Sequence, residues 1–320
     1  KSMIMQRIIT CISVLLLVSS LAYAQKDLPE EITVLYYNID SFFDTSDDEG
    51  SEDDKYSPDG LYVWDSDRYE DKVKAIAAII SSASGKKQPD IIGIGGVENR
   101  KVLDDILSER RLRRADYEIR ITGSEGLNVA FIVKKDLMSI KNVESISIDT
   151  TFRSKEDPYN SNILYVSGEL KGPGRCHFFI NQWPGIENSR RAPENQRMGA
   201  AVALRKKIDE IYNFERNARI VIMGTFNDEP TDRSIMTILN AANKRKNIDF
   251  RDLYNLYYDM HNTSDRGTVI INGAWLMWDQ IIVSPSFIND TDKYYIERDA
   301  GKIYIPEYAG EDFYNLRSTY

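Results

Sequence analysis

The chain has 320 residues, of which 41 are Lys or Arg and 50 are Asp or Glu, so its formal net charge is −9 at pH 7. A protein this acidic does not attract a polyanion through its overall charge, and we therefore expect no bulk binding of nucleic acid. The length suits one large domain built from strands and helices, or two small ones.

The first 24 residues predict a secretory signal peptide. Lys1 and Arg7 flank the start of an apolar stretch that is too short to span a bilayer comfortably and closes on the A-x-A pattern of residues 22–24. Cleavage there lowers the net charge from −9 to −11, because the segment carries those two basic residues and no acid. We expect an exported protein, periplasmic or extracellular, with no membrane span after cleavage. Residues 25–31 are predicted to be a tether and residues 32–320 one domain.

Hydrophobic periodicity predicts the elements of that domain in chain order. A helix is predicted behind a capping box of Asp67 and Glu70, with Tyr69, Val73, Ile76 and Ile80 on its apolar face and Gly85 after its end. Further helices are predicted at 100–109, 193–212 and 232–243. Strands are predicted at 32–39, 90–96, 117–121, 127–134, 162–170, 176–182, 218–224, 267–271, 279–283 and 302–306. Many strands with a few interspersed helices, and no repeat or composition break, indicate a single α+β domain.

Several predicted strands end on polar residues. Such a set of strand ends is a common way to place reactive groups on a rigid scaffold, although Asn and Asp are also ordinary turn formers. The clusters are Asn38 with Asp40, Glu98 with Asn99, Asn181 with Gln182 and Trp183, and Asn227 with Asp228.

Together and in this order, these clusters and the strands before them resemble the endonuclease/exonuclease/phosphatase superfamily of DNase I-like, metal-dependent phosphodiesterases, most closely its exported bacterial branch. The matching stretches cover nearly all of residues 31–320 and include "LYYNIDSFFDT", "DIIGIGGVENRKVLDDIL", "HFFINQWP", "IVIMGTFNDEPTDRSI" and "WLMWDQIIVSPS". The resemblance implies a four-layer α/β/β/α sandwich with two mainly antiparallel sheets. Whether the family's final strand is present stays open, because its closing Asp-His pair has no counterpart before Tyr320.

The same resemblance implies which residues occupy the family's catalytic positions. Asn38, Asn227 and Asp279 keep the family's residue types. Gly96 falls where relatives have the metal-binding Glu, Gln182 where they have a His, and Thr225 where they have an Asp.

These three replacements remove chemistry. The Thr225 hydroxyl has no pKa near neutrality, so it cannot accept a proton from water, and general-base assistance is worth about 10²–10⁴ in rate. Gln182 can donate a hydrogen bond but cannot carry a charge. Gly96 offers no oxygen from a side chain to a hard cation. The sequence therefore predicts a catalytically impaired member that acts by binding a ligand in the family's cleft, with no cofactor.

Two alternatives stay open. The first is a divalent-metal-dependent phosphodiesterase or nuclease with a rebuilt site, in which Asp40, Glu98, Asp228 and Asp279 hold Mg²⁺ or Mn²⁺. The second concerns the cleft itself: besides the family positions, Trp183 and Arg190 are candidates for ligand contact, but Asn38, Asn227 and Trp183 are equally suited to holding loops and to packing.

Overall fold

The computed structural model describes residues 28–46, 53–85, 87–123, 126–148, 162–187, 190–191, 194–263 and 266–306. The chain divides into an N-terminal unit, residues 1–32, and a unit of residues 33–320, and the fold described below is that of the second unit. The predicted signal peptide of residues 1–24 lies outside the described residues, and so do residues 25–27 of the predicted tether.

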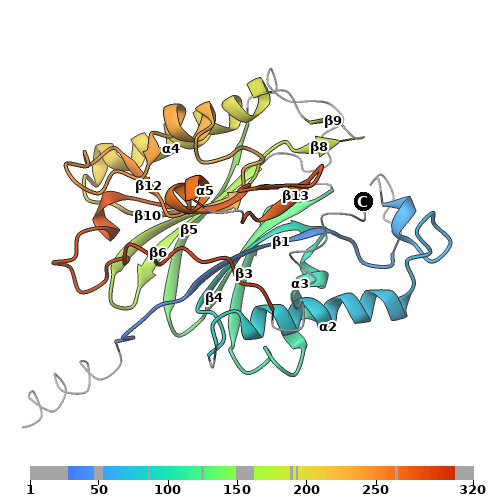
Figure 1. The fold of residues 1–320 in the computed structure, drawn as a ribbon. Helices are drawn as coiled ribbons and strands as arrows, with labels where there is room; N and C mark the ends of the chain where they lie inside the picture. Colours follow the sequence, from blue (N-terminus) through green and yellow to red (C-terminus); the bar gives the residue numbers. More distant parts are fainter. Residues whose placement is uncertain are drawn as a thin grey trace, which may run out of the picture. The chain divides into compact units, whose positions relative to one another are not determined.

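The first sheet of the described residues has the strand order β1-β2-β4-β3 (Figure 1). β1 (Val34–Phe42) runs parallel to β2 (Ile91–Val97), and β4 (Asn128–Lys134) is antiparallel to both β2 and β3 (Tyr117–Ile121). Two helices, α2 (Ser66–Ser82) and α3 (Arg100–Ser108), bury their apolar faces on one side of this sheet, where Ile80 and Ile106 pack in one cluster with Ile92 and Ile132.

The start of α2 corrects one prediction. The helix begins at Ser66, and the side chain of Asp65 caps it by accepting a hydrogen bond from the backbone N–H of Arg68. The predicted capping box of Asp67 and Glu70 is therefore wrong, because Asp65 already satisfies the first free N–H groups. The predicted apolar face is confirmed, since Tyr69, Val73, Ile76 and Ile80 are all buried.

The second sheet has the strand order β11-β12-β15-β10-β7-β6-β5. Its strands are β5 (Met138–Ser147), β6 (Asn162–Leu170), β7 (Gly174–Gln182), β10 (Arg219–Thr225), β11 (Ala241–Ala242), β12 (Leu253–Asn255) and β15 (Asp279–Val283). Only the pairs β7–β10 and β11–β12 are parallel. The long helix α4 (Glu194–Phe214) packs Leu204 and Ile208 into the cluster on one side of this sheet.

The two sheets face each other. The rings of Phe131 on β4 and Phe178 on β7 lie with their centroids 5.0 Å apart, and Met223 of β10 fills the space above Gly93 of β2. The layers therefore run helices, sheet, sheet, helix, as predicted (Figure 1). Two hairpins and a short helix lie outside these two sheets: β8 (Ile186–Glu187) with β9 (Arg190–Arg191), β13 (Val269–Ile271) with β14 (Ala274–Leu276), and α5 (Tyr258–Thr263). Short 3₁₀ turns span Asp54–Tyr56 and Pro285–Phe287.

Two other predicted elements differ from the structure, and one long strand was not predicted. The predicted helix 232–243 is a single π-helical turn, Ser234–Ile238, which ends before Asn240 takes a left-handed conformation (φ 56°) and β11 begins. Residues 302–306 join no sheet. Strand β5 was not predicted; it is an edge strand with a register shift between Ile140 and Asn142, which breaks the alternation on which a strand prediction depends.

Candidate functional site

The ends of four core strands meet at one edge of the sandwich. β1 and β2 run parallel, and so do β7 and β10, so each pair carries its C-terminal ends to the same side. β15 runs the other way and therefore starts there, with Asp279 opposite Thr225, while Gln182 lies opposite Thr225 on the other flank. Hydrogen bonds from Tyr36 and Asn38 to β10 bring the end of β1 to the same place.

Thr225 is the centre of a hydrogen-bond network at this edge. Its hydroxyl donates to Oδ1 of Asp279 (2.5 Å) and accepts from Nδ2 of Asn38 (3.0 Å). The hydroxyl of Tyr36 lies 3.0 Å from the same oxygen and also accepts from the backbone N–H of Thr225 (3.0 Å). Thr225 is 4% exposed, so its hydroxyl is shielded from water. The Thr225 oxygen is thus fully used in holding three neighbours together.

Burial changes the acid of this network. Asp279 is partly buried, and desolvation raises the pKa of its carboxyl to about 6, although the hydrogen bond from Thr225 lowers it. The carboxyl remains mostly ionised at pH 7, because that value is still a unit below the surrounding pH.

Tyr36 belongs to the site, although the sequence analysis did not single it out. It precedes Asn38 by two residues in β1, so both side chains lie on the same face of the strand. Its hydroxyl fits because β2 carries a glycine opposite it: a Cβ on Gly95 would lie 2.3 Å from this hydroxyl and 2.6 Å from Oε1 of Gln182. The period of two from Asn38 was the feature of the sequence that pointed to Tyr36.

Gly96 occupies a position where the backbone itself resists a side chain. Its φ is +77°, a conformation that L-residues rarely adopt. A Cβ there would lie 3.0 Å from Oδ1 of Asn38 and 3.1 Å from the backbone N of Ser41. That Asn38 oxygen already accepts the backbone N–H of Asp40 (3.0 Å). This end of β1 is therefore packed directly against the glycine, and the register of β1 and β2 shifts at the same point.

The remaining predicted contact residues have internal roles. Gln182 is 4% exposed, and its Oε1 lies 3.4 Å from the Tyr36 hydroxyl. Nδ2 of Asn227 donates to the backbone oxygen of Trp183 (2.7 Å). Trp183 is fully buried, packs edge-on against Phe226 and donates its indole N–H to Asn181. The structure thus places Trp183 in the core rather than on a ligand-contact surface. The side chain of Arg190 lies outside what the structure describes.

Two of the carboxylates proposed for a cation differ in their surroundings. Asp228 is buried and forms an ion pair with Nε of Arg197 (2.6 Å), while the hydroxyl of Ser234 donates to its other oxygen (2.6 Å). Asp40 is exposed, in the left-handed conformation that follows Asn38. The Arg197 pair connects α4 to the end of β10 and was not foreseen from the sequence, because its partners are 31 residues apart.

Glu98 lies in a separate acidic cluster. It is buried, and its Oε2 accepts the backbone N–H of Asp44 (2.7 Å) and Nδ2 of Asn99 (3.2 Å). Burial raises the pKa of the Glu98 carboxyl to about 8; the Asp44 N–H lowers this pKa, and the charges of Asp44 and Asp53 raise it further. Glu98 is therefore a largely protonated, structural acid at neutral pH.

Both histidines lie elsewhere. Nδ1 of His177 lies 2.8 Å from the hydroxyl of Tyr165. Nδ1 of His261 forms a pair with Glu229 (3.2 Å). Within the described ranges, no group of three or more His, Cys, Asp or Glu side chains could hold a metal ion. A hard cation prefers several oxygen ligands that include carboxylates, and the side chains at this edge do not fit that requirement.

A pocket of about 460 Å³ opens beside the network. One wall is β1 from Val34 to Asn38, another is β15 with Asp279, and residues 302–306 and Trp275 close the remaining sides. This volume is typical of small-molecule sites. The pocket thus joins an apolar wall to the polar end formed by Asn38 and Asp279.

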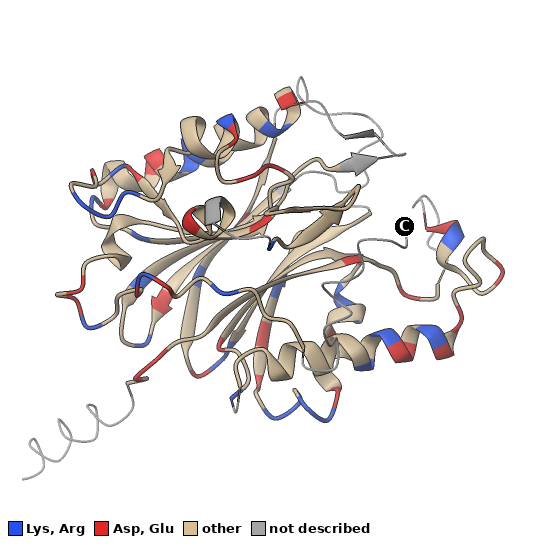
Figure 2. Cartoon of the chain, viewed as in Figure 1, with Lys and Arg blue, Asp and Glu red and all other residues tan. Residues whose placement is uncertain are grey.

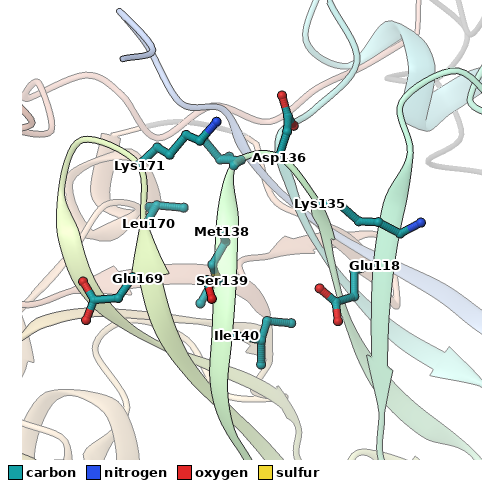
Figure 3. Close-up of a pocket in the computed structure, with 10 residues that line it drawn as sticks. Glu118, Lys135, Asp136, Met138, Ser139, Ile140, Glu169, Leu170 and Lys171 are labelled. Carbon is teal, nitrogen blue, oxygen red and sulfur yellow. The ribbon is translucent and has the colours of Figure 1, made fainter. Parts of the chain in front are cut away.

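A second depression, of about 640 Å³, lies at the opposite end of β7, where Lys171 precedes the strand (Figure 3). Glu118 and Lys135 approach it from the first sheet and Glu169 and Lys171 from the second. Lys135 forms an ion pair with Asp116 (2.5 Å). The rim of this depression carries charges of both signs, as is common where loops meet solvent. None of the polar strand-end clusters lies in it.

Charge is mixed over the helices as well. Basic and acidic residues lie close to one another on α2 and α4 (Figure 2), with pairs such as Lys74–Glu70 and Arg205–Asp209. In the described part of the chain, no helix is long and apolar enough to cross a membrane.

Comparison with known proteins gives the chain's relatives. A sequence model described as "Endonuclease/Exonuclease/phosphatase family" matches residues 33–313. Among solved structures, a mannosyl-6-phosphatase of Bacteroides thetaiotaomicron is similar at 17% identity (80% of this chain, 86% of that chain, TM-score 0.54). The human Nocturnin catalytic domain with bound sulfate is similar at 16% identity (84% and 93%, TM-score 0.51). An endonuclease/exonuclease/phosphatase family protein of B. thetaiotaomicron is similar at 17% (79% and 83%, TM-score 0.51).

No match was found among curated proteins. At such identities the structural likenesses establish the fold and leave the activity to the site. They confirm the predicted α+β sandwich of DNase I type.

Proposed function

Because the chain belongs to the endonuclease/exonuclease/phosphatase family, as its motifs predicted, we propose that it is a member that binds a ligand at the shared strand ends without hydrolysing a phosphate ester. The observation that carries the proposal is Thr225. It stands where the family resemblance places the catalytic Asp, and its hydroxyl is hydrogen-bonded to Asp279, Asn38 and Tyr36.

The chemistry of this arrangement supports binding rather than turnover. A threonine hydroxyl that already donates to Asp279 cannot take a proton from water, so the step that a general base performs has no agent at this position. Gln182, in the position of the family His, offers an amide and no charge. Gly96, whose backbone is left-handed, has no side-chain oxygen that could bind a metal. No step of a hydrolytic mechanism follows from these residues.

The alternative is a phosphodiesterase or nuclease that uses Mg²⁺ or Mn²⁺ at a rebuilt site. Its candidate ligands are Asp40, Glu98, Asp228 and Asp279. Asp228 is paired with Arg197, and Glu98 belongs to the cluster with Asp44. These contacts weigh against the alternative, since recruiting either acid would break the ion pair with Arg197 or the hydrogen bond from the Asp44 N–H.

A hydrolysis assay tests the proposal directly. The protein is incubated with bis-p-nitrophenyl phosphate and with plasmid DNA in the presence of Mg²⁺, Mn²⁺ or Ca²⁺, beside the Asp279→Asn variant. We expect no release of p-nitrophenol and no nicking above the protein-free blank with either protein. Metal-dependent turnover that Asp279→Asn abolishes would overturn the proposal and establish the alternative.

We further propose that the protein is exported, since residues 1–24 have the composition of a cleaved signal peptide. Expression of the full chain in a bacterial host, followed by fractionation and N-terminal sequencing, tests this. The expected mature protein begins at Gln25 and is absent from the cytoplasmic fraction; a cytoplasmic, uncleaved product would contradict it.

A further inference from the structure

We propose that the 460 Å³ pocket between β1 and β15 binds a small organic cation with an aromatic or aliphatic body, and that Asp279 is the anionic partner of its charged group. The inference rests on the proposed ligand-binding function and names the chemical class of the ligand. It departs from what the fold's relatives would suggest, because the group expected here is positively charged rather than a phosphate.

The first argument is the state of the Asp279 carboxylate. Its Oδ1 accepts the hydroxyl of Thr225, and within the described residues no hydrogen bond reaches its Oδ2. The same holds for ion pairs: no described Lys, Arg or His has a nitrogen within 4.0 Å of this carboxylate. Asp279 nevertheless lines the pocket. A desolvated carboxylate with an open oxygen gains most from a partner that brings both a positive charge and N–H donors.

The second argument is the groups that surround Asp279. The hydroxyl of Tyr257 donates to the backbone oxygen of Lys302 (3.1 Å), and that of Tyr36 is taken up by Thr225. Lys302 is the cationic side chain among the pocket residues, and it is exposed. These neighbours leave Asp279 as the charge that a ligand meets at the inner end of the pocket. An anionic group placed beside this carboxylate would be repelled by it.

The third argument is the wall. Tyr257, Trp275 and Tyr304 line the pocket together with aliphatic side chains of β1 and of residues 302–306. Aromatic faces attract a cation through their quadrupole and also accommodate an apolar body. An apolar wall, aromatic rings and one carboxylate at the end together match an amine or amidine attached to a ring or a short alkyl chain.

A matched series of ligands tests the inference on the unaltered protein. The probes are 2-phenylethylamine, its neutral counterpart 2-phenylethanol and the anion phenylacetate, titrated at pH 7.5 while backbone amide shifts are recorded by NMR. We expect the amine to bind at least about ten-fold more tightly than the alcohol, and phenylacetate not to bind. The amide shifts should change at Trp275 and Asp279. Equal affinity for amine and alcohol, tighter binding of phenylacetate, or shifts confined to other parts of the chain would overturn the inference.

Substitutions provide the second readout. Asp279→Asn keeps an oxygen that can accept from Thr225 but removes the charge, so it should abolish the ten-fold preference for the amine over the alcohol. Asp136→Asn is the matched control, because this exposed acid lines the depression at the opposite end of the sandwich (Figure 3) and its loss should change nothing. Trp275→Leu should weaken the binding of both the amine and the alcohol, because both lose contact with the aromatic wall. An Asp279→Asn variant that retains the preference would overturn the inference.

The two proposals fail separately. Hydrolysis of bis-p-nitrophenyl phosphate would overturn the non-hydrolytic function whatever the amine does. Absence of amine binding in an inert protein would overturn only the ligand class.

Discussion

Placing an acid at the centre of the network should destabilise the protein in a pH-dependent way. The Thr225 oxygen lies 2.5 Å from Oδ1 of Asp279, so the carboxylate of a Thr225→Asp variant would lie about 3 Å from that of Asp279. At an effective dielectric constant of about 20, two charges at that distance repel by roughly 5 kcal/mol. Protonating one of the two carboxylates costs less free energy than this repulsion. Burial already raises the pKa of Asp279 to about 6, so holding it neutral at pH 7 costs about 1.4 kcal/mol.

The sign follows from the direction of the shift. An acid whose pKa is higher in the folded than in the unfolded protein makes the fold less stable as the pH rises above the unfolded value, near 4. The penalty of Thr225→Asp relative to the uncharged, equally sized Thr225→Asn should therefore be small at pH 5, at least about 1.4 kcal/mol at pH 7 and larger at pH 8. It levels off near the roughly 5 kcal/mol of two ionised groups.

Urea unfolding of both variants at pH 5, 7 and 8 measures this difference, with the steric change common to both. If the two variants unfold with the same free energy at pH 5 and at pH 8, the introduced carboxylate and Asp279 are not in contact, and the network described for Thr225 is wrong.

Three further predictions concern stability. Glu98→Gln should raise the free energy of unfolding relative to the native chain by roughly 2–5 kcal/mol at pH 8.5 and hardly at pH 5. The reason is that the pKa of Glu98 is raised to about 8, so that its ionisation opposes folding above pH 4.5. Urea titrations at the two pH values measure the difference. Gly96→Ala should lower the stability of the fold, measured by thermal unfolding, by about 1–2 kcal/mol more than Gly85→Ala does. Both glycines have φ above +70°, but a Cβ on Gly85 would meet open space. Equal losses of stability would contradict the close packing of Gly96 against Asn38. Arg197→Met should lower the free energy of unfolding by about 3–5 kcal/mol, because it removes the cation that pairs with the buried Asp228. Adding Asp228→Asn should recover part of this loss. A double variant as unstable as the single one would refute the pairing.

Core strands were predictable where their residues alternate or run apolar without interruption. The predicted strands 117–121 and 279–283 coincide with β3 and β15, and the predicted helix 100–109 differs from α3 by one residue. These segments are buried on at least one face, so the pattern of apolar residues in their sequence reflects that burial. The edge strand β5 is exposed along much of its length and carries a register shift, and it went unpredicted for that reason.

Local rules failed where tertiary contacts decide the backbone. The residues after Asp232 have helical periodicity, but Asn240 takes a left-handed conformation that directs the chain into β11 beside Leu253. Residues 302–306 alternate like a strand, yet strand formation depends on a partner, and a single sequence does not reveal which edge such a segment would meet. The capping error at Asp67 is of another kind, since Asp65 was an equally good candidate two residues earlier.

The candidate site was predictable in position but not in its contacts. The resemblance placed Asn38, Thr225 and Asp279 at the strand ends, and the structure brings these three into one network. It did not single out Tyr36, which shares a strand face with Asn38 but whose role depends on the distance between the two sheets. That distance is short here because β2 has no side chain at Gly93 or Gly95, where a Cβ would collide with Met223 and with the Tyr36 hydroxyl.

Gly96, Gln182 and Thr225 are physically coupled through Tyr36 and Asn38, so a change at one of them affects the others. The hydroxyl of Tyr36 occupies the space that Gly95 leaves, accepts the N–H of Thr225 and lies beside Gln182. Asn38 spans the gap between Gly96 and Thr225, with its oxygen against the glycine and its amide on the hydroxyl. A carboxylate at Gly96 would displace Asn38, and an acid at Thr225 would confront Asp279. Each change disrupts a hydrogen bond that another position supplies, so the arrangement is stable only as a set.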